Sequence, residues 1–332
     1  MKRALSGVQP TGQLHLGNYA GAIRQFIELQ ANHEMYIFVA SYHALTSGRD
    51  APALAAATRQ VVIDYLAFGL DPQRTHIYLQ QDVPQVTELC WLLSCVCPKS
   101  LMDKATTFKD KTAKGIPASV GLYSYPILQA ADILSVDPDV VPVGEDQRQH
   151  IEITRDLAEK FNHHYGEVFR LPDILVRPDA GTLPGVDGQK MSKSYGNTID
   201  PFLAEKPLKK LINSIKTDSL PVEAAKDPEK CTVFQIYRAL AGANDPRTTA
   251  LAGKYQAGGL GYGQAKQALF ELILEHFGPA RARREKLMHD PGYIDQVLTS
   301  GAQAAQAKVC EVVARARQAC GLGTSRAAIT IQ

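Results

Sequence analysis

The sequence of 332 residues lacks several patterns that mark common protein classes. Its six cysteines form no C-x-x-C pair, and no histidine stands near them at a zinc-site spacing, so we expect no metal-binding site. No apolar run reaches the roughly 20 residues that cross a bilayer. Gly7 and Pro10 interrupt the short apolar stretch after Met1, so no signal peptide is expected. We therefore expect a cytoplasmic, reduced and soluble protein with no membrane partner.

The net charge of the chain is also small, because Lys and Arg together outnumber Asp and Glu by only two. The distribution is uneven. Residues 186–332 hold 20 basic and 14 acidic side chains, whereas residues 1–185 hold 16 and 20. A basic C-terminal part suits a polyanion such as nucleic acid, although solvated helix faces explain such an excess about as often. Hydrophobic residues make up 45% of the chain, enough to bury a substantial core.

The first half of the chain alternates patterns typical of strands and helices. This alternation predicts an α/β fold, a Rossmann-like doubly wound parallel sheet covered by helices on both faces. Ligands of such sheets bind at the carboxyl ends of the strands, which places residues 7–18, 40–46 and 143–147 around one crevice. Strands are predicted at residues 4–9, 35–40, 75–79 and 140–143. Helices are predicted at residues 16–27, 54–70, 85–97, 125–134, entered through Pro126, and 147–161, capped by Asp146.

The second half is predicted to be a C-terminal all-helical domain. Prolines and glycines between residues 171 and 188 indicate a connection or a mobile loop. Helices then follow at residues 201–216, 234–241, 263–288 and 302–320. The expected division is a Rossmann-like domain of residues 1–188, a mobile loop of residues 189–197, a helical domain of residues 198–290, and residues 291–332, whose helix can pack back on the first domain.

The turn after the first predicted strand has the layout of a phosphate site. Residues 9–12 (QPTG) lead into residues 15–18 (HLGN), which open a helix. Unpaired N–H groups at a helix N-terminus attract anions, and His15 and Asn18 can donate hydrogen bonds to phosphate oxygens. Taken alone, an ordinary strand-to-helix turn explains the pattern equally well. The sequence contains neither G-x-G-x-x-G nor G-x-x-x-x-G-K-[ST], which argues against a dinucleotide cofactor and a P-loop.

A basic loop occupies residues 189–197 (QKMSKSYGN). Lys190 and Lys193 stand three residues apart between glycines, so the loop can close over an anionic ligand and open again for product release. A K-x-x-K pair is usually only a solvated surface loop. The functional interpretation is preferred here because the phosphate-site turn lies upstream in the same chain.

These two motifs together resemble the paired signatures of class I aminoacyl-tRNA synthetases. Residues 6–12 (SGVQPTG), 17–22 (GNYAGA), 130–134 (AADIL) and 141–147 (VPVGEDQ) further resemble bacterial tryptophanyl-tRNA synthetases. The resemblance covers nearly the whole chain and is weakest in the helical part. It implies activation of L-tryptophan by ATP with Mg²⁺, transfer of the amino acid to tRNA(Trp), binding of the anticodon region by the helical domain, and a homodimer.

The resemblance also implies roles for individual residues. Asp132 matches the carboxylate that accepts the indole N–H, and a flat apolar slot with one buried acceptor suits a ring with one donor. A substrate without that donor would leave the carboxylate unpaired, which discriminates strongly. The residues implied at the tryptophan site are Leu5, Gly7, Gln9, His43, Tyr125, Gln129, Asp132, Ile133, Val141, Val143 and Gln147.

The nucleotide site is implied in the same way, and three lysines match residues that contact the triphosphate. The residues implied at the ATP site are Gln9, Pro10, Thr11, Gly12, Gly17, Asn18, Gly144, Glu145, Asp146, Lys190, Met191, Ser192, Lys193 and Ser194. The residues implied in catalysis are His15, Asn18, Lys111, Lys190 and Lys193. The chain departs from the family pattern at Leu5 and Gln129, where Phe and Met are common, and at residues 41–42 (SY), which replace an Asp-Gln pair.

Several alternatives stay open at this point. Without the resemblance, Asp132 is best interpreted as a helix-surface carboxylate, and Tyr125 and His43 as core residues. Tyrosyl-tRNA synthetases share the architecture, and small-molecule adenylyltransferases can share the first turn. A non-catalytic tRNA-binding or regulatory relative of a synthetase is the third alternative. Contacts with tRNA phosphates are sought among Lys209, Lys210, Arg281, Arg283 and Arg284, although surface solvation explains each singly.

Overall fold

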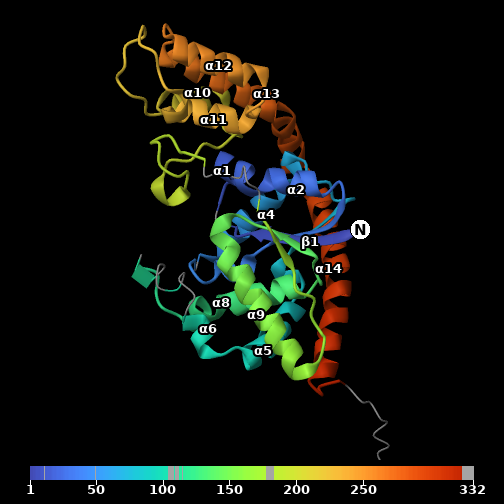
Figure 1. The fold of residues 1–332 in the computed structure, drawn as a ribbon. Helices are drawn as coiled ribbons and strands as arrows, with labels where there is room; N and C mark the ends of the chain where they lie inside the picture. The colour runs from blue at the N-terminus through green and yellow to red at the C-terminus, as the bar shows by residue number, and fades with distance from the viewer. Residues whose placement is uncertain are drawn as a thin grey trace, which may run out of the picture.

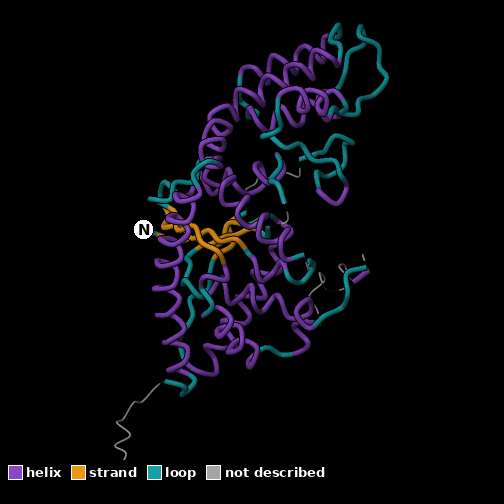
Figure 2. The backbone as a smooth tube through the Cα atoms, turned by 180° about the vertical axis from the view of Figure 1, so that it is seen from behind, coloured by secondary structure: helices purple, strands orange, loops and turns teal. Residues whose placement is uncertain are grey.

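One five-stranded parallel sheet forms the centre of the protein (Figure 2). The computed structural model describes residues 1–10, 12–48, 50–103, 108, 112–113, 115–176 and 183–323. The strand order is β3-β2-β1-β4-β5, and it reverses between β1 and β4, which confirms the predicted doubly wound α/β fold. The strands are β1 (Lys2–Val8), β2 (His33–Val39), β3 (Thr75–Leu79), β4 (Val140–Pro142) and β5 (Asp173–Leu175).

The two faces of the sheet bury separate cores, because side chains alternate along a strand. Met35 and Ile37 of β2 pack into one core together with α4 (Ala51–Phe68). Tyr36 and Phe38 of the same strand face the other core. Helices α5 (Gln85–Val96), α8 (Val120–Leu134) and α9 (Arg148–Tyr165) cover that second face, on the opposite side from α4 (Figure 1).

A helical bundle stands beyond the α4 side of the sheet (Figure 1). It contains α10 (Glu205–Asn213), α11 (Thr232–Ala241), α12 (Pro246–Ala257) and part of α13 (Tyr262–Met288). The long helix α13 continues from this bundle down onto α4. The C-terminal helix α14 (Pro291–Ala319) then returns to the sheet and packs along β3 and α5. Within the described residues, no helix is both long and apolar enough to cross a membrane.

Gly301 lets α14 lie directly against the edge of the sheet. A Cβ atom on Gly301 would overlap the carbonyl oxygen of Ile77 in β3 and lie 2.6 Å from its carbonyl carbon. Because backbone cannot yield as a flexible side chain can, we expect Gly301→Ala to lower the free energy of unfolding by about 3 kcal/mol. The matched control is Gly253→Ala in α12, where nothing lies within 4 Å of the added atom. Equal stability of the two variants in denaturant titrations would contradict this packing.

Some predicted elements differ from the observed ones. Helix α8 begins at Val120, where Ser119 Oγ accepts from Leu122 N–H at 3.1 Å, so Pro126 lies inside the helix and does not open it. Helix α9 begins at Arg148 after a 3-10 turn, so its N-cap is Gln147 and not Asp146. Strand β5 lies in the segment predicted as a connection, and α12 was not predicted. The first helix consists of α1 (Leu16–Asn18), a π-helical turn (Tyr19–Ile23) and α2 (Arg24–Leu29).

Candidate active site

A cavity of about 540 Å³ opens at the carboxyl ends of β1 and β4, where the strand order reverses. Three segments that are far apart in the sequence line it: the turn after β1, the segment after β4 and the basic loop. The structure thus brings together the two motifs that the sequence pattern singled out. The predicted residues that line this cavity are Gly7, His15, Gly17, Asn18, Val143, Gly144, Glu145, Gln147, Lys190, Met191, Ser192 and Lys193.

His15 closes the first turn of α1 with a reciprocal pair of hydrogen bonds. Its Nδ1 accepts from Gly17 N–H at 3.1 Å, and the Asn18 side-chain oxygen accepts from His15 N–H at 3.1 Å. Burial, and then the charge of Lys193, lower the pKa of His15 to about 4. The imidazole is therefore neutral at pH 7, and since Nδ1 accepts, its proton is on Nε2. This leaves His15 as a neutral N–H donor at the cavity.

The same lowered pKa predicts how His15 affects stability with pH. The unfolded state binds more protons than the folded state between pH 6.5 and 4, so stability falls as the pH falls through this window. We expect the free energy of unfolding of the protein, relative to His15→Asn, to drop by about 2 kcal/mol between pH 7 and pH 5. Denaturant titrations of both proteins at the two pH values check this. If the difference in free energy of unfolding between the wild type and His15→Asn were the same at both pH values, it would contradict a buried neutral imidazole at His15.

The basic loop and the segment that follows it each make a hydrogen bond with α1. Gly17 N–H points at Met191 Sδ at 3.3 Å, and Leu16 N–H donates to Ile199 O at 2.9 Å. Within the loop, the buried Asn197 accepts from Ser192 N–H at 2.8 Å and donates to Lys190 O at 3.0 Å. These contacts connect the loop to the phosphate-site turn across the cavity.

Lys193 lies on the inner side of this loop. An atom added at Gly12 Cβ would stand 3.9 Å from Lys193 Nζ, so the ammonium lies beside the first turn. Burial lowers the pKa of Lys193, and the carboxylates of Asp64 and Asp200 partly oppose that shift. Lys190 lines the same cavity and is exposed. Two lysines of one loop therefore border the place where an anionic ligand can sit.

Asp132 is a buried residue of α8, with 3% of its surface exposed, and not a helix-surface carboxylate. Its Oδ2 lies 2.8 Å from His43 Nε2. Gln80 Nε2 lies 2.9 Å from Oδ1 and 2.8 Å from Oδ2. Nearby, the buried Tyr125 hydroxyl lies 2.7 Å from His150 Nε2. Neither Gln80 nor His150 was predicted, although Gln80 directly follows β3 at the edge of the sheet where ligands are expected.

The expected single crevice is divided. Tyr42, Leu45 and Thr46 line a separate cavity of about 360 Å³, together with Tyr125. They do not line the first cavity, and His43 of the same short helix contacts Asp132 instead of lining either cavity. The apolar residues predicted at the tryptophan site, Leu5, Ile133 and Val141, are buried in the core that contains α8.

The remaining predicted site residues fall into two groups. Gln9, Pro10, Gly12, Gln129 and Ser194 are described but line neither cavity, and Ser194 Oγ lies 2.8 Å from Ser192 Oγ. Thr11, Lys111 and the side chain of Asp146 lie outside the described residues.

Three arginines that were considered for phosphate contacts bind this chain itself. Arg281 donates to Pro201 O at 2.5 Å, Arg283 donates to Ala67 O at 2.9 Å, and Arg284 pairs with Asp64 at 2.8 Å. They fasten α13 to α4 and to the segment that follows the basic loop. Because a guanidinium has five N–H donors, these bonds do not test a contact with tRNA phosphates, and that expectation stays a prediction. Lys209 and Lys210 on α10 are exposed, and so is Arg283.

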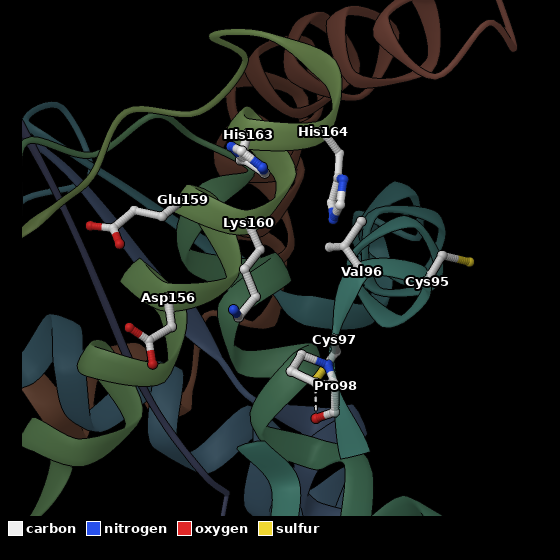
Figure 3. Close-up of a pocket in the computed structure, with 9 residues that line it drawn as sticks. All are labelled: Cys95, Val96, Cys97, Pro98, Asp156, Glu159, Lys160, His163 and His164. Atoms are coloured by element: carbon white, nitrogen blue, oxygen red, sulfur yellow. Dashed lines mark hydrogen bonds between the residues drawn. The ribbon is translucent and has the colours of Figure 1, made fainter. Parts of the chain in front are cut away.

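A third cavity, of about 670 Å³, lies between the end of α5 and α9 (Figure 3). Lys160 of α9 points toward the Cys97–Pro98 segment there. This cavity contains no residue predicted at a site and shares no lining residue with the cavity at β1 and β4. Among the described residues, no group of three or more His, Cys, Asp or Glu side chains is arranged to hold a metal ion.

Comparison with known proteins identifies the family. Residues 1–278 match the family described as tRNA synthetases class I (W and Y). A tryptophan–tRNA ligase from Fusobacterium nucleatum is 49% identical over 97% of this chain and 98% of its own length. One from Rhodopirellula baltica is 48% identical over 96% of this chain and 99% of its own length.

A solved structure gives the same result. Tryptophanyl-tRNA synthetase from Campylobacter jejuni, complexed with ADP and tryptophan, superposes with a TM-score of 0.89 and 44% identity, over 96% of this chain and 100% of that chain. The fold and the sequence relatives thus agree. The chain belongs to the family of class I tRNA synthetases for tryptophan and tyrosine, and within it to the tryptophan–tRNA ligases.

Proposed function

We propose that this chain activates L-tryptophan with ATP and transfers the tryptophanyl group to tRNA(Trp). The observation that carries the proposal is the single cavity at β1 and β4, in which the His15 turn and the Lys190–Lys193 loop face each other. The turn supplies the neutral N–H donor of His15, and the loop supplies the cations Lys190 and Lys193. These groups suit ATP, because negative charge develops on the departing pyrophosphate when the α-phosphate is attacked. The high identity to tryptophan–tRNA ligases supports tryptophan over tyrosine as the amino acid.

The first step needs no covalent bond to the protein. The tryptophan carboxylate attacks the α-phosphorus of ATP in line, the bond to the bridging oxygen breaks, and tryptophanyl-adenylate and pyrophosphate form. His15 Nε2–H and the Asn18 amide donate to phosphate oxygens, while Lys190 and Lys193 take up the charge that develops on pyrophosphate. Mg²⁺ enters with ATP as part of the substrate. Lys111 joins these lysines by resemblance.

The second step and the amino-acid site use other parts of the chain. A ribose hydroxyl of the terminal nucleotide of tRNA attacks the activated carbonyl, and AMP leaves. In the first step Asp132 accepts the indole N–H. Gly7 lets β1 lie close to Phe38 of β2, because a Cβ atom there would lie 2.6 Å from Phe38 O. Gln9, Val143, Gly144 and Gln147 complete the surroundings of the two substrates, as the resemblance implies.

Partners and organisation are proposed from the resemblance and the surface. Residues 1–188 form the catalytic domain, residues 189–197 the phosphate loop, residues 198–290 the anticodon-binding domain, and residues 291–332 the segment that returns to the catalytic domain. The protein is proposed to act in the cytoplasm as a homodimer. Trp91 on α5, which is 68% exposed, and the exposed Val120 supply apolar surface for a second copy.

Charging of tRNA tests the proposed function. Purified protein, ATP, Mg²⁺ and unfractionated tRNA, which contains acceptors for both amino acids, are expected to give acid-precipitable counts with labelled tryptophan and background counts with labelled tyrosine. Charging with tyrosine would instead identify a tyrosyl enzyme. Binding of tRNA without charging by either amino acid would support the non-catalytic alternative.

A further inference from the structure

Gln80 is a buried amide, 1% exposed, in the short 3-10 turn Gln80–Asp82 that follows β3. Its Oε1 accepts from Tyr42 N–H at 2.9 Å, and its Nε2 contacts both oxygens of Asp132. A backbone N–H can only donate, so the oxygen of Gln80 must face Tyr42. Its NH₂ group must therefore face Asp132, which fixes the orientation of this amide without reference to hydrogen positions.

His43 provides the second donor. Its Nε2 lies 2.8 Å from Asp132 Oδ2, which Gln80 also contacts. Among the described residues, Oδ2 thus accepts from two nitrogens, whereas Oδ1 accepts from Gln80 only. Each carboxylate oxygen has two lone pairs, so Oδ1 is the atom with capacity for a further N–H.

From this geometry we infer that Gln80 is a positioning residue that determines specificity, because it holds the Asp132 carboxylate so that Oδ1 alone is open to the N–H of the substrate ring. The inference rests on the proposed function, in which Asp132 accepts the indole N–H. With Gln80 in place, a ring without an N–H leaves a buried carboxylate oxygen short of one partner. Without Gln80, the carboxylate can rotate and water can occupy the vacated space, so that Asp132 is satisfied whichever ring is bound.

The neighbouring side chain supplies a matched control. Gln81 lies in the same turn, and its Oε1 accepts from Ser41 Oγ; within the part of the chain that the structure describes, it makes no hydrogen bond with Asp132. Gln80 and Gln81 therefore both tie this turn to the helix Ser41–Ala44, and only Gln80 touches the carboxylate. A loss of local structure affects both variants, whereas a loss of specificity affects Gln80 alone.

The test compares tryptophan with β-benzothienylalanine, in which sulfur replaces the ring N–H. The ratio of kcat/KM for the two amino acids is measured by pyrophosphate exchange in the wild type, Gln80→Met and Gln81→Met. We expect Gln80→Met to lower the preference for tryptophan at least about tenfold, the range of one hydrogen bond to a charged group. The KM for ATP is expected to stay within about twofold, and Gln81→Met is expected to keep the wild-type ratio.

Two results would overturn the inference: an unchanged ratio in Gln80→Met, or an equal fall in Gln81→Met. If Gln80→Met does not fold, Gln80→Asn withdraws the same NH₂ group by one methylene, and an unchanged ratio in that variant overturns the inference equally. A wild type that shows no preference for tryptophan would instead contradict the role of Asp132 in the proposed function. The experiment therefore distinguishes a failure of the role inferred for Gln80 from a failure of the role proposed for Asp132.

Discussion

Lys193→Ala is expected to slow tryptophan-dependent pyrophosphate exchange by about 10²–10³-fold while the dissociation constant for tryptophan changes less than about threefold. The ammonium lies beside Gly12 of the first turn, and Lys193 lines the cavity, so it can follow the charge that develops on the leaving pyrophosphate. A cation that acts on the transition state changes kcat more than it changes binding of an amino acid that it does not touch.

Exchange kinetics and calorimetric titration with tryptophan separate these effects. Lys209→Ala is the matched control, because Lys209 is an exposed lysine of α10 outside the cavity. Near-normal exchange in Lys193→Ala, or equal losses in both variants, would rule out the role given to this side chain.

The second large effect is expected at Asp132. Asp132→Asn keeps the size of the side chain but leaves one acceptor oxygen, which His43 and Gln80 already require. The new NH₂ group would then take the place of Oδ1 and face the indole N–H, donor against donor. We expect kcat/KM for tryptophan to fall by about 10²-fold, since a hydrogen bond to a charged group is lost and a buried donor is left unpaired.

Binding of tryptophan to Asp132→Asn is measured directly, alongside the KM for ATP, which should stay close to the wild-type value. Asp156→Asn replaces an aspartate on the rim of the distant cavity at α9 and serves as control. Unchanged tryptophan affinity in Asp132→Asn would show that the indole N–H is accepted elsewhere.

Periodicity in the sequence predicts those strands and helices whose buried side chains recur at a regular spacing. Residues 75–79 form β3 with the predicted bounds, because a compact apolar run between turn residues has few other solutions. Strand β5 escaped prediction because it has only three residues, pairs at the edge with β4 and carries no apolar alternation. Helix α12 escaped because only Thr248, Leu251 and Tyr255 of its twelve residues are buried.

The candidate site was predictable where its chemistry lies in contiguous motifs. His15 and Lys193 belong to such motifs, and the topology of the sheet explains why they meet. The partners of Asp132 were not predictable in the same way. Gln80 lies 52 positions from Asp132 in the sequence. The ion pair of Arg284 with Asp64 spans 220 positions in the same way. No spacing rule connects side chains that meet only after the sheet has formed.

The most direct test is pyrophosphate exchange with ATP and each of the twenty amino acids in turn, with and without tRNA. Activation of tryptophan at the cavity between β1 and β4 predicts exchange with tryptophan alone, and exchange that proceeds without tRNA. Equal or faster exchange with tyrosine, or no exchange with any amino acid, would contradict it.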